Sequence, residues 1–266
     1  RPLHCGFASI PRAPLCAALG RKSEVNVWVS STVLEWSHHN EHGSGPSLDD
    51  ESQTVWRAHE IWRHANSLIS ENCSSFALSD AIANLKRAIN HRLQSLSKAY
   101  YFNALPFSSD KKALEKFQHY GIIRPSMLRE LFEVRNAIEH RDVDPPSLVR
   151  CEQYVDFVWY FLKSTDSLLL MQADDVVFWS GSETGCALRF CVNLAAQWEI
   201  IVHGDLTEEL ILSGPRPGAL EIDESYPRPE YNKSGVHGKW NPTDEQLTHF
   251  ARCYFATTGF WYEDHA

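Results

Sequence analysis

The stretch Leu128-Arg-Glu-Leu-Phe-Glu-Val-Arg-Asn-Ala-Ile-Glu-His-Arg141 decides the fold of this 266-residue chain. Its apolar residues recur at three- and four-residue steps, which predicts an amphipathic helix from Ser126 to about His140. The next residues, Asp142-Val-Asp-Pro-Pro146, must end that helix, because proline lacks a donor and disfavours helical geometry before it. The polar residues of the stretch are therefore expected near the C-terminal end of a helix.

Three of these polar side chains suit the cleavage of RNA without a metal: Arg135, Asn136 and His140. Histidine titrates near neutral pH, so it can act as base or acid on the ribose 2′-hydroxyl and the leaving oxygen. Arginine stays protonated and presents a planar fork to phosphate oxygens. The amide of Asn136 can orient the histidine or contact the sugar-phosphate.

The spacing of these residues raises a geometric question. Positions five apart on a helix lie roughly 140° apart around its axis, so Arg135 and His140 do not share a face of an intact helix. Asn136 and His140 are four apart and do share one. Two solutions exist: either the helix unwinds near His140, or a second subunit supplies the missing partner.

The Arg-x4-His pattern from Arg135 to His140, within a helical segment, resembles the HEPN superfamily, many of whose members are metal-independent ribonucleases. The resemblance covers residues 76–170. It implies cleavage to a 2′,3′-cyclic phosphate without metal or cofactor, by a homodimeric toxin or antiviral defence protein with an antitoxin or regulatory partner. It also implies roles: His140 as general acid or base, Arg135 as phosphate stabiliser, Asn136 as orienting group and Arg141 as a further phosphate contact.

Two other interpretations stay open. Some HEPN domains only bind or dimerise, so the alternative function is a non-catalytic dimerisation, nucleotide-binding or adaptor module. An arginine and a histidine near the C-terminal end of a helix also interact favourably with its dipole. Glu139 can pair with Arg135 at i, i+4, in which case the motif is only a helix terminus.

A second helix, expected from about Ser79, carries a mildly basic face opposite its apolar stripe, made of Lys86, Arg87, His91 and Lys98. Such faces are usually just solvated, but we predict that Arg87 and His91 on it contact RNA. Residues 76–170 contain 13 Lys/Arg and 11 Asp/Glu, whereas the rest of the chain contains 12 and 23. The acidic excess thus lies outside the segment with the motif. We expect weak non-specific affinity for RNA that depends on local contacts.

The chain is predicted to be an α+β protein in three parts. Residues 1–46 form an N-terminal extension, with a strand at Glu24–Ser30 and a loop or linker at His38–Pro46. Residues 47–170 form the HEPN-like helical bundle. Residues 171–266 form a smaller β-rich domain of no recognised family, with a C-terminal helix.

The C-terminal part alternates short apolar runs with turn residues. The predicted elements are strands at Asp175–Trp179, Cys186–Val192, Gln197–Val202 and Glu209–Leu212, a Pro/Gly-rich loop from Gly214 to Asn241, and a helix from Thr243. The aromatic residues of this part are expected in its core more than on a base-stacking surface.

Composition places few limits on the function. Hydrophobic residues make up 43% and charged residues 22%, as in ordinary globular proteins. No run reaches the ~20 apolar residues of a membrane span, and the first twenty residues do not read as a secretory signal. Seven cysteines without regular spacing favour a reducing compartment and predict a cytoplasmic protein. Cys186, Cys191, His249 and Cys253 lack a Cys-x2-Cys pair, so no metal site is expected.

Overall fold

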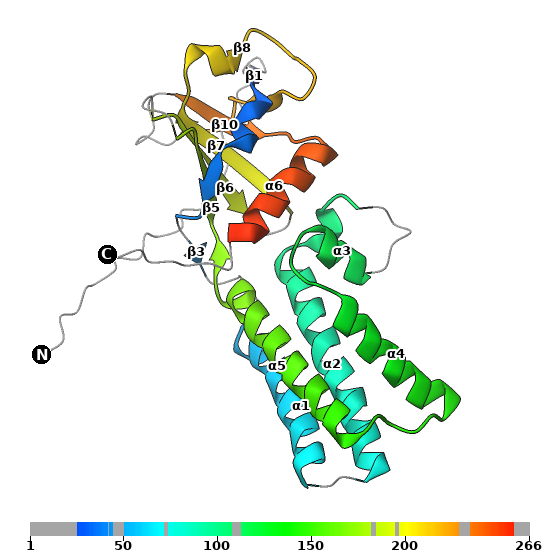
Figure 1. Cartoon of the computed structure of the whole chain (residues 1–266). Coiled ribbons are helices and arrows are strands. Elements are labelled where there is room, and N and C mark those ends of the chain that lie inside the picture. Colours follow the sequence, from blue (N-terminus) through cyan, green and yellow to red (C-terminus); the bar gives the residue numbers. More distant parts are fainter. Residues whose placement is uncertain are drawn as a thin grey trace, which may run out of the picture.

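The chain is an α+β protein in which a helical bundle adjoins an antiparallel sheet, which confirms the predicted fold class (Figure 1). The computed structural model describes residues 26–41, 43–44, 51–71, 74–107, 113–181, 185–194, 197–228 and 235–257. Figure 1 shows the bundle below and the sheet with helix α6 (Asp244–Thr257) above. Helix α3 (Ala113–His119) lies where these two halves meet.

The bundle is built from three long helices, with a fourth packed on one of them. These are α1 (Glu51–Glu71), α2 (Ser75–Ala99), α5 (Leu148–Leu170) and α4 (Ser126–Arg141). Helices α1, α2 and α5 pack against one another, and α4 lies against α2. None of the described helices is both long and apolar enough to cross a membrane.

Serine caps fix where two of these helices begin. The hydroxyl of Ser74 accepts a hydrogen bond from the backbone N–H of Ala77, and that of Ser147 accepts one from Arg150. Each cap satisfies a backbone donor that has no partner within its own helix. Helix α2 therefore begins at Ser75, earlier than the predicted start near Ser79, and α5 begins at Leu148.

One side of α2 forms the centre of the bundle core. Its fully buried apolar residues recur mostly at three- and four-residue steps; they are Ala81, Ile82, Leu85, Ala88, Ile89 and Leu96. Because a helix repeats every 3.6 residues, the residues between them face outward. The outward side of α2 is polar and carries the candidate site.

The second half is an eight-stranded antiparallel sheet in the order β2-β5-β6-β7-β10-β9-β1-β8. Its strands are β1 (Asn26–Val29), β2 (Ser37–His39), β5 (Asp175–Trp179), β6 (Ala187–Asn193), β7 (Glu199–Asp205), β8 (Ile211–Leu212), β9 (Leu220–Asp223) and β10 (Val236–Trp240). Helix α6 covers one face, where the Phe250 ring lies 5.2 Å from Phe190 and 5.6 Å from Trp240 between centroids.

Two strands of this sheet come from the N-terminal part of the chain. The strand predicted at Glu24–Ser30 is confirmed as β1, which pairs with β8 and β9. Strand β2 pairs with β5, with His38 opposite Phe178. The predicted loop at His38–Pro46 is therefore wrong at its start, because the backbone of β2 hydrogen-bonds along the edge of the sheet. A further pair, β3 (Gly43–Ser44) with β4 (Gln172–Ala173), lies beside the end of α5.

The loop predicted from Gly214 to Asn241 is also wrong, because it contains β9 and β10. Proline and glycine obscured the short alternation in which Leu220 and Ile222 are buried. Gly238, in β10, is required by packing. A Cβ at this position would lie 2.3 Å from the carbonyl oxygen of Asp223 on the neighbouring strand. Glycine permits this close approach of the two strands.

Aromatic side chains join the two halves. The Trp198 indole donates to the carbonyl of Tyr100 at 2.8 Å, and the Tyr254 hydroxyl donates to that of Ala173 at 2.9 Å. The Phe255 ring of α6 lies 5.1 Å from that of Tyr100 at the end of α2. Each of these rings is buried, so the described aromatics act here as core, as predicted.

Candidate functional site

Helix α4 continues without a break through the whole motif. It ends at Arg141, and Asp142 follows in the left-handed region with a φ of 50°. Of the two solutions that the sequence left open, the helix does not unwind near His140, because the break comes only after Arg141. On a continuous helix the side chains of Arg135 and His140 point to different sides.

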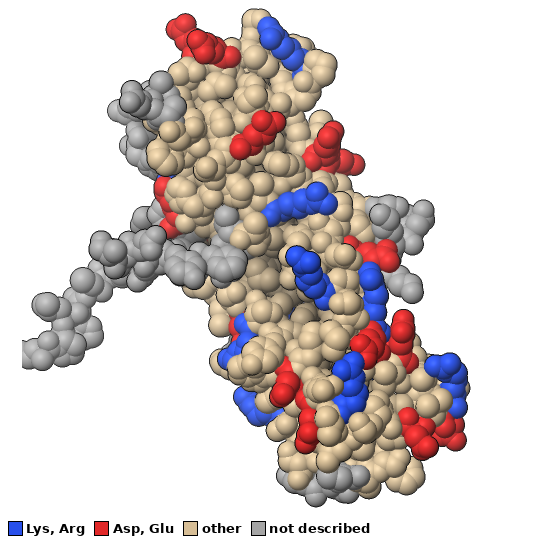
Figure 2. All heavy atoms as spheres, viewed as in Figure 1, with Lys and Arg blue, Asp and Glu red and all other residues tan. Residues whose placement is uncertain are grey.

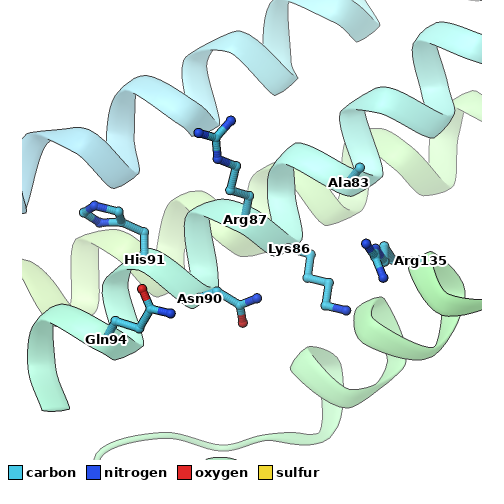
Figure 3. A pocket seen from close by; sticks show the side chains of 7 residues that line it. All are labelled: Ala83, Lys86, Arg87, Asn90, His91, Gln94 and Arg135. Atoms are coloured by element: carbon cyan, nitrogen blue, oxygen red, sulfur yellow. The ribbon is translucent and has the colours of Figure 1, made fainter. Parts of the chain in front are cut away.

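Arg135 lines a groove that it shares with the polar side of α2 (Figure 3). The groove has a volume of about 480 Å³ and is lined by Ala83, Lys86, Arg87, Asn90, His91, Gln94 and Arg135. Three predicted site residues, Arg87, His91 and Arg135, thus come together although two lie on α2 and one on α4. In Figure 3 the Lys86 side chain extends toward Arg135, while His91 lies farther along α2.

Asn136 connects two of the three cationic side chains of this groove, Lys86 and Arg135. Its side-chain oxygen accepts hydrogen bonds from the Lys86 ammonium at 3.1 Å and from the Arg135 guanidinium at 3.4 Å. Burial and, secondarily, the charge of Arg135 lower the pKa of Lys86. Among the described residues Lys86 forms no ion pair with a carboxylate. Two close cations that share one neutral acceptor form a site where a phosphate would be stabilised.

Glu139 lies between the two ends of the motif. Its carboxylate forms an ion pair with Arg135, as predicted for i, i+4, and lies 3.5 Å from Nε2 of His140. The side chain of His140 is 68% exposed, and neither it nor Arg141 lines the groove. Within one chain, Glu139 therefore connects Arg135 to His140, although only Arg135 reaches the groove.

His91 is the imidazole that lies in the groove itself. Burial lowers its pKa, and the charges of Arg57, Arg92 and Arg87 lower it further. Its Nδ1 is buried and has no hydrogen-bond partner among the described residues. Burial and the neighbouring positive charges both disfavour the protonated ring.

The sequence did not single out Asn90, Gln94 or Glu139 for this site, and it placed Lys86 only on a basic face. Asn90 and Gln94 follow Lys86 at four-residue steps, so helical periodicity applied to polar residues would have found them. The position of Glu139 between Arg135 and His140 depends on rotamers that spacing does not fix.

No group of three or more metal-binding side chains occurs among the described residues. The Sγ of Cys253 lies 3.8 Å from Nε2 of His249, a nitrogen that also lies 3.0 Å from the carbonyl oxygen of Leu34. Cys186 is buried, and Cys191 packs beside His203 at 3.8 Å. These four candidates for zinc ligands do not form one cluster.

Comparison with known proteins adds no relative. No protein-family model, curated protein or solved structure matches this chain. The groove and the motif are therefore the features from which a function can be inferred.

Proposed function

We propose that this protein is a metal-independent endoribonuclease of the HEPN type, acting as a toxin or in antiviral defence. The observation that carries the proposal is that Arg87, His91 and Arg135, predicted from two separate segments, line one cationic groove. Lys86 adds a further cation there. Such a groove matches the phosphate backbone of RNA in charge.

The chemistry assigns a role to each residue of the motif. The ribose 2′-oxygen attacks phosphorus while a base takes its proton, the bond to the 5′-oxygen breaks, and an acid protonates that oxygen. His140 serves as base or acid. Arg135 stabilises the charge that develops on the phosphorane, and Asn136 orients the reacting groups. The products are a 2′,3′-cyclic phosphate and a 5′-hydroxyl, and Arg141 contacts a flanking phosphate.

The continuity of α4 supports a homodimer. Arg135 and His140 of one chain point to different sides of α4. The groove of one copy therefore requires His140 of a second copy to complete the catalytic groups. Two motifs facing one cleft would bring a phosphate-binding arginine and a histidine together. We propose this arrangement for the active form, with an antitoxin or regulatory protein as a further partner.

We place the protein in the cytoplasm. Cys151, Cys186 and Cys191 are free thiols, and the first two are buried. Free, unpaired cysteines suit a reducing compartment.

One observation favours the alternative, a non-catalytic binding module. The Arg135 guanidinium is already paired with Glu139, and the Lys86 ammonium is held by Asn136. A groove in this state can bind an anion without bringing His140 to it. The same residues would then anchor RNA or a nucleotide.

Cleavage of total RNA in EDTA separates the two functions. The wild type should release products that end in 2′,3′-cyclic phosphate, and His140→Ala and Arg135→Ala should each reduce the rate by at least about a hundredfold. His64→Ala and Arg63→Ala, at exposed positions of α1, are the matched controls and should cleave like the wild type.

Cleavage that persists in His140→Ala at the wild-type rate would refute the catalytic assignment. If no protein cleaves but Arg135→Ala alone loses RNA binding, the binding module replaces the nuclease.

A further inference from the structure

A second cavity lies where the helical bundle meets the sheet. It has a volume of about 490 Å³ and is lined by Phe107, Glu115, Gln118, His119, Arg129 and Arg252. These residues belong to the segment before α3, to α3 itself, to the first turn of α4 and to α6. The volume lies within the range of small-molecule sites. In Figure 2, lysine and arginine side chains are visible where α6, α3 and α4 adjoin.

Two arginines from opposite halves of the molecule supply the charge of this cavity. Arg129 makes one hydrogen bond, to the neutral amide of Gln118 at 3.3 Å. Arg252 donates through Nε to the carbonyl of His119 at 2.9 Å and lies 3.2 Å from its Nδ1. Neither arginine forms an ion pair with a carboxylate among the residues that the structure describes. Each guanidinium has five N–H donors, so most of them stay available to an anion.

The rest of the lining suits an organic part of the same ligand. The rings of Phe107 and His119 lie 5.5 Å apart between centroids and give the cavity an aromatic side. Glu115 and Gln118 supply acceptors for hydroxyl or amine groups. Aromatic rings with a few placed polar groups are typical of small-ligand sites, and paired arginines are typical of phosphate recognition.

From this geometry we infer that the cavity binds a small organic phosphate of nucleotide size. Arg129 and Arg252 hold the phosphate, and Phe107 and His119 contact the planar ring. Because one arginine comes from the bundle and the other from α6, the bound phosphate links the two halves. Arg129 also lies on α4, the helix with the RNA motif, so the ligand would stabilise the position of that helix. The inference does not rest on the proposed nuclease activity.

Calorimetric titration of the full chain with adenosine monophosphate, inorganic phosphate and adenosine tests the site. Adenosine monophosphate should bind with a Kd below about 1 mM, and more tightly than either inorganic phosphate or adenosine. Arg129→Gln and Arg252→Gln should each weaken binding about tenfold or more. Arg63→Gln, at an exposed position of α1 outside both grooves, is the matched control and should bind like the wild type, whereas Lys86→Gln reports on binding in the other groove.

The variant Arg129→Gln decides the outcome, because the hydrogen bond that its exposed side chain makes to Gln118 lies on the surface and its loss should leave the fold intact. Thermal melts without ligand check folding for Arg252→Gln, which also loses its contacts with His119. The inference is overturned if the wild type shows no binding at millimolar ligand. Unchanged affinity in Arg129→Gln, or affinity lost only in Lys86→Gln, would also overturn it.

Discussion

Helix α2 places cations in two contrasting settings. Arg92 is fully buried and donates to Asp166 at 2.7 Å, and His59 lies 2.9 Å from the same carboxylate oxygen. Lys86, on the outward side, has only the amide of Asn136 as a polar partner in the described part of the chain. The buried cation is satisfied by a carboxylate from α5 and so fixes how three helices fit together. The outer cation has no such partner, which leaves it for a ligand.

The largest effect that this contrast predicts is on stability. Arg92→Ala removes a fully buried side chain and its ion pair with Asp166, and leaves that carboxylate with only His59 and Lys163 beside it in the described part of the chain. The free energy of unfolding should fall by about 3–5 kcal/mol in urea denaturation at pH 7. Lys86→Ala is the matched control on the same helix and should cost no more than about 0.5 kcal/mol. Equal losses in the two variants would contradict the contrast.

The same buried cluster predicts a dependence of stability on pH. Burial alone would raise the pKa of Asp166, but hydrogen bonds from His59 and Arg92 outweigh it and hold the pKa below its ordinary 3.8. A carboxyl group whose pKa is lowered in the folded state stabilises the fold above its unfolded pKa, and this contribution is lost as pH falls through the folded value.

Between pH 5 and pH 3 the wild type should therefore lose more free energy of unfolding than Asp166→Asn. The variant should be less stable than the wild type at pH 7, because Arg92 then lacks a charge partner. Parallel loss in both proteins over this pH range would assign the acid sensitivity to other carboxylates.

The outer cations predict an effect on binding and little on stability. Affinity for single-stranded RNA can be measured over a range of salt in the His140→Ala background. The slope of log K against log salt should become shallower by about 0.7 for each phosphate contact that is removed. Lys86→Gln and Arg87→Gln should each reduce it by up to this amount, whereas Arg63→Gln on α1 should not. If the variant that carries both Lys86→Gln and Arg87→Gln shows an unchanged slope, RNA binds outside this groove.

The contrast on α2 also shows what the sequence can and cannot predict. The spacing of the apolar residues predicted both α2 and α4, because burial of one face dominates the choice of secondary structure. The same reading placed Lys86, Arg87 and His91 on a polar face. It could not predict that this face meets Arg135, because the packing of α4 on α2 depends on tertiary contacts.

Two further features lay beyond the sequence for similar reasons. Arg92 follows Ile89 by three residues and so falls on the buried side of α2, but the sequence could not identify its partner, because Asp166 lies 74 positions away on α5. The strands β9 and β10 were predicted as loop because their glycines and prolines are typical of turns. There Gly238 permits a close approach of two strands, so the local signal and the tertiary requirement differ.

The smallest predicted effect concerns His91, which lies on α2 between the outward Lys86 and the buried Arg92. Burial is the largest cause of its lowered pKa, and Arg57, Arg92 and Arg87 add to it. Removing the charge of Arg57 from the facing helix α1 should raise the pKa of His91, because one repelling charge is lost. Arg57 is half exposed, so solvent screens much of its charge. Titration of the imidazole by NMR should therefore show a small upward shift in Arg57→Gln that diminishes at high salt. Arg63→Gln on the same helix should leave the titration unchanged, and a shift of equal size there would mean that general charge, not the neighbouring guanidinium, sets the value.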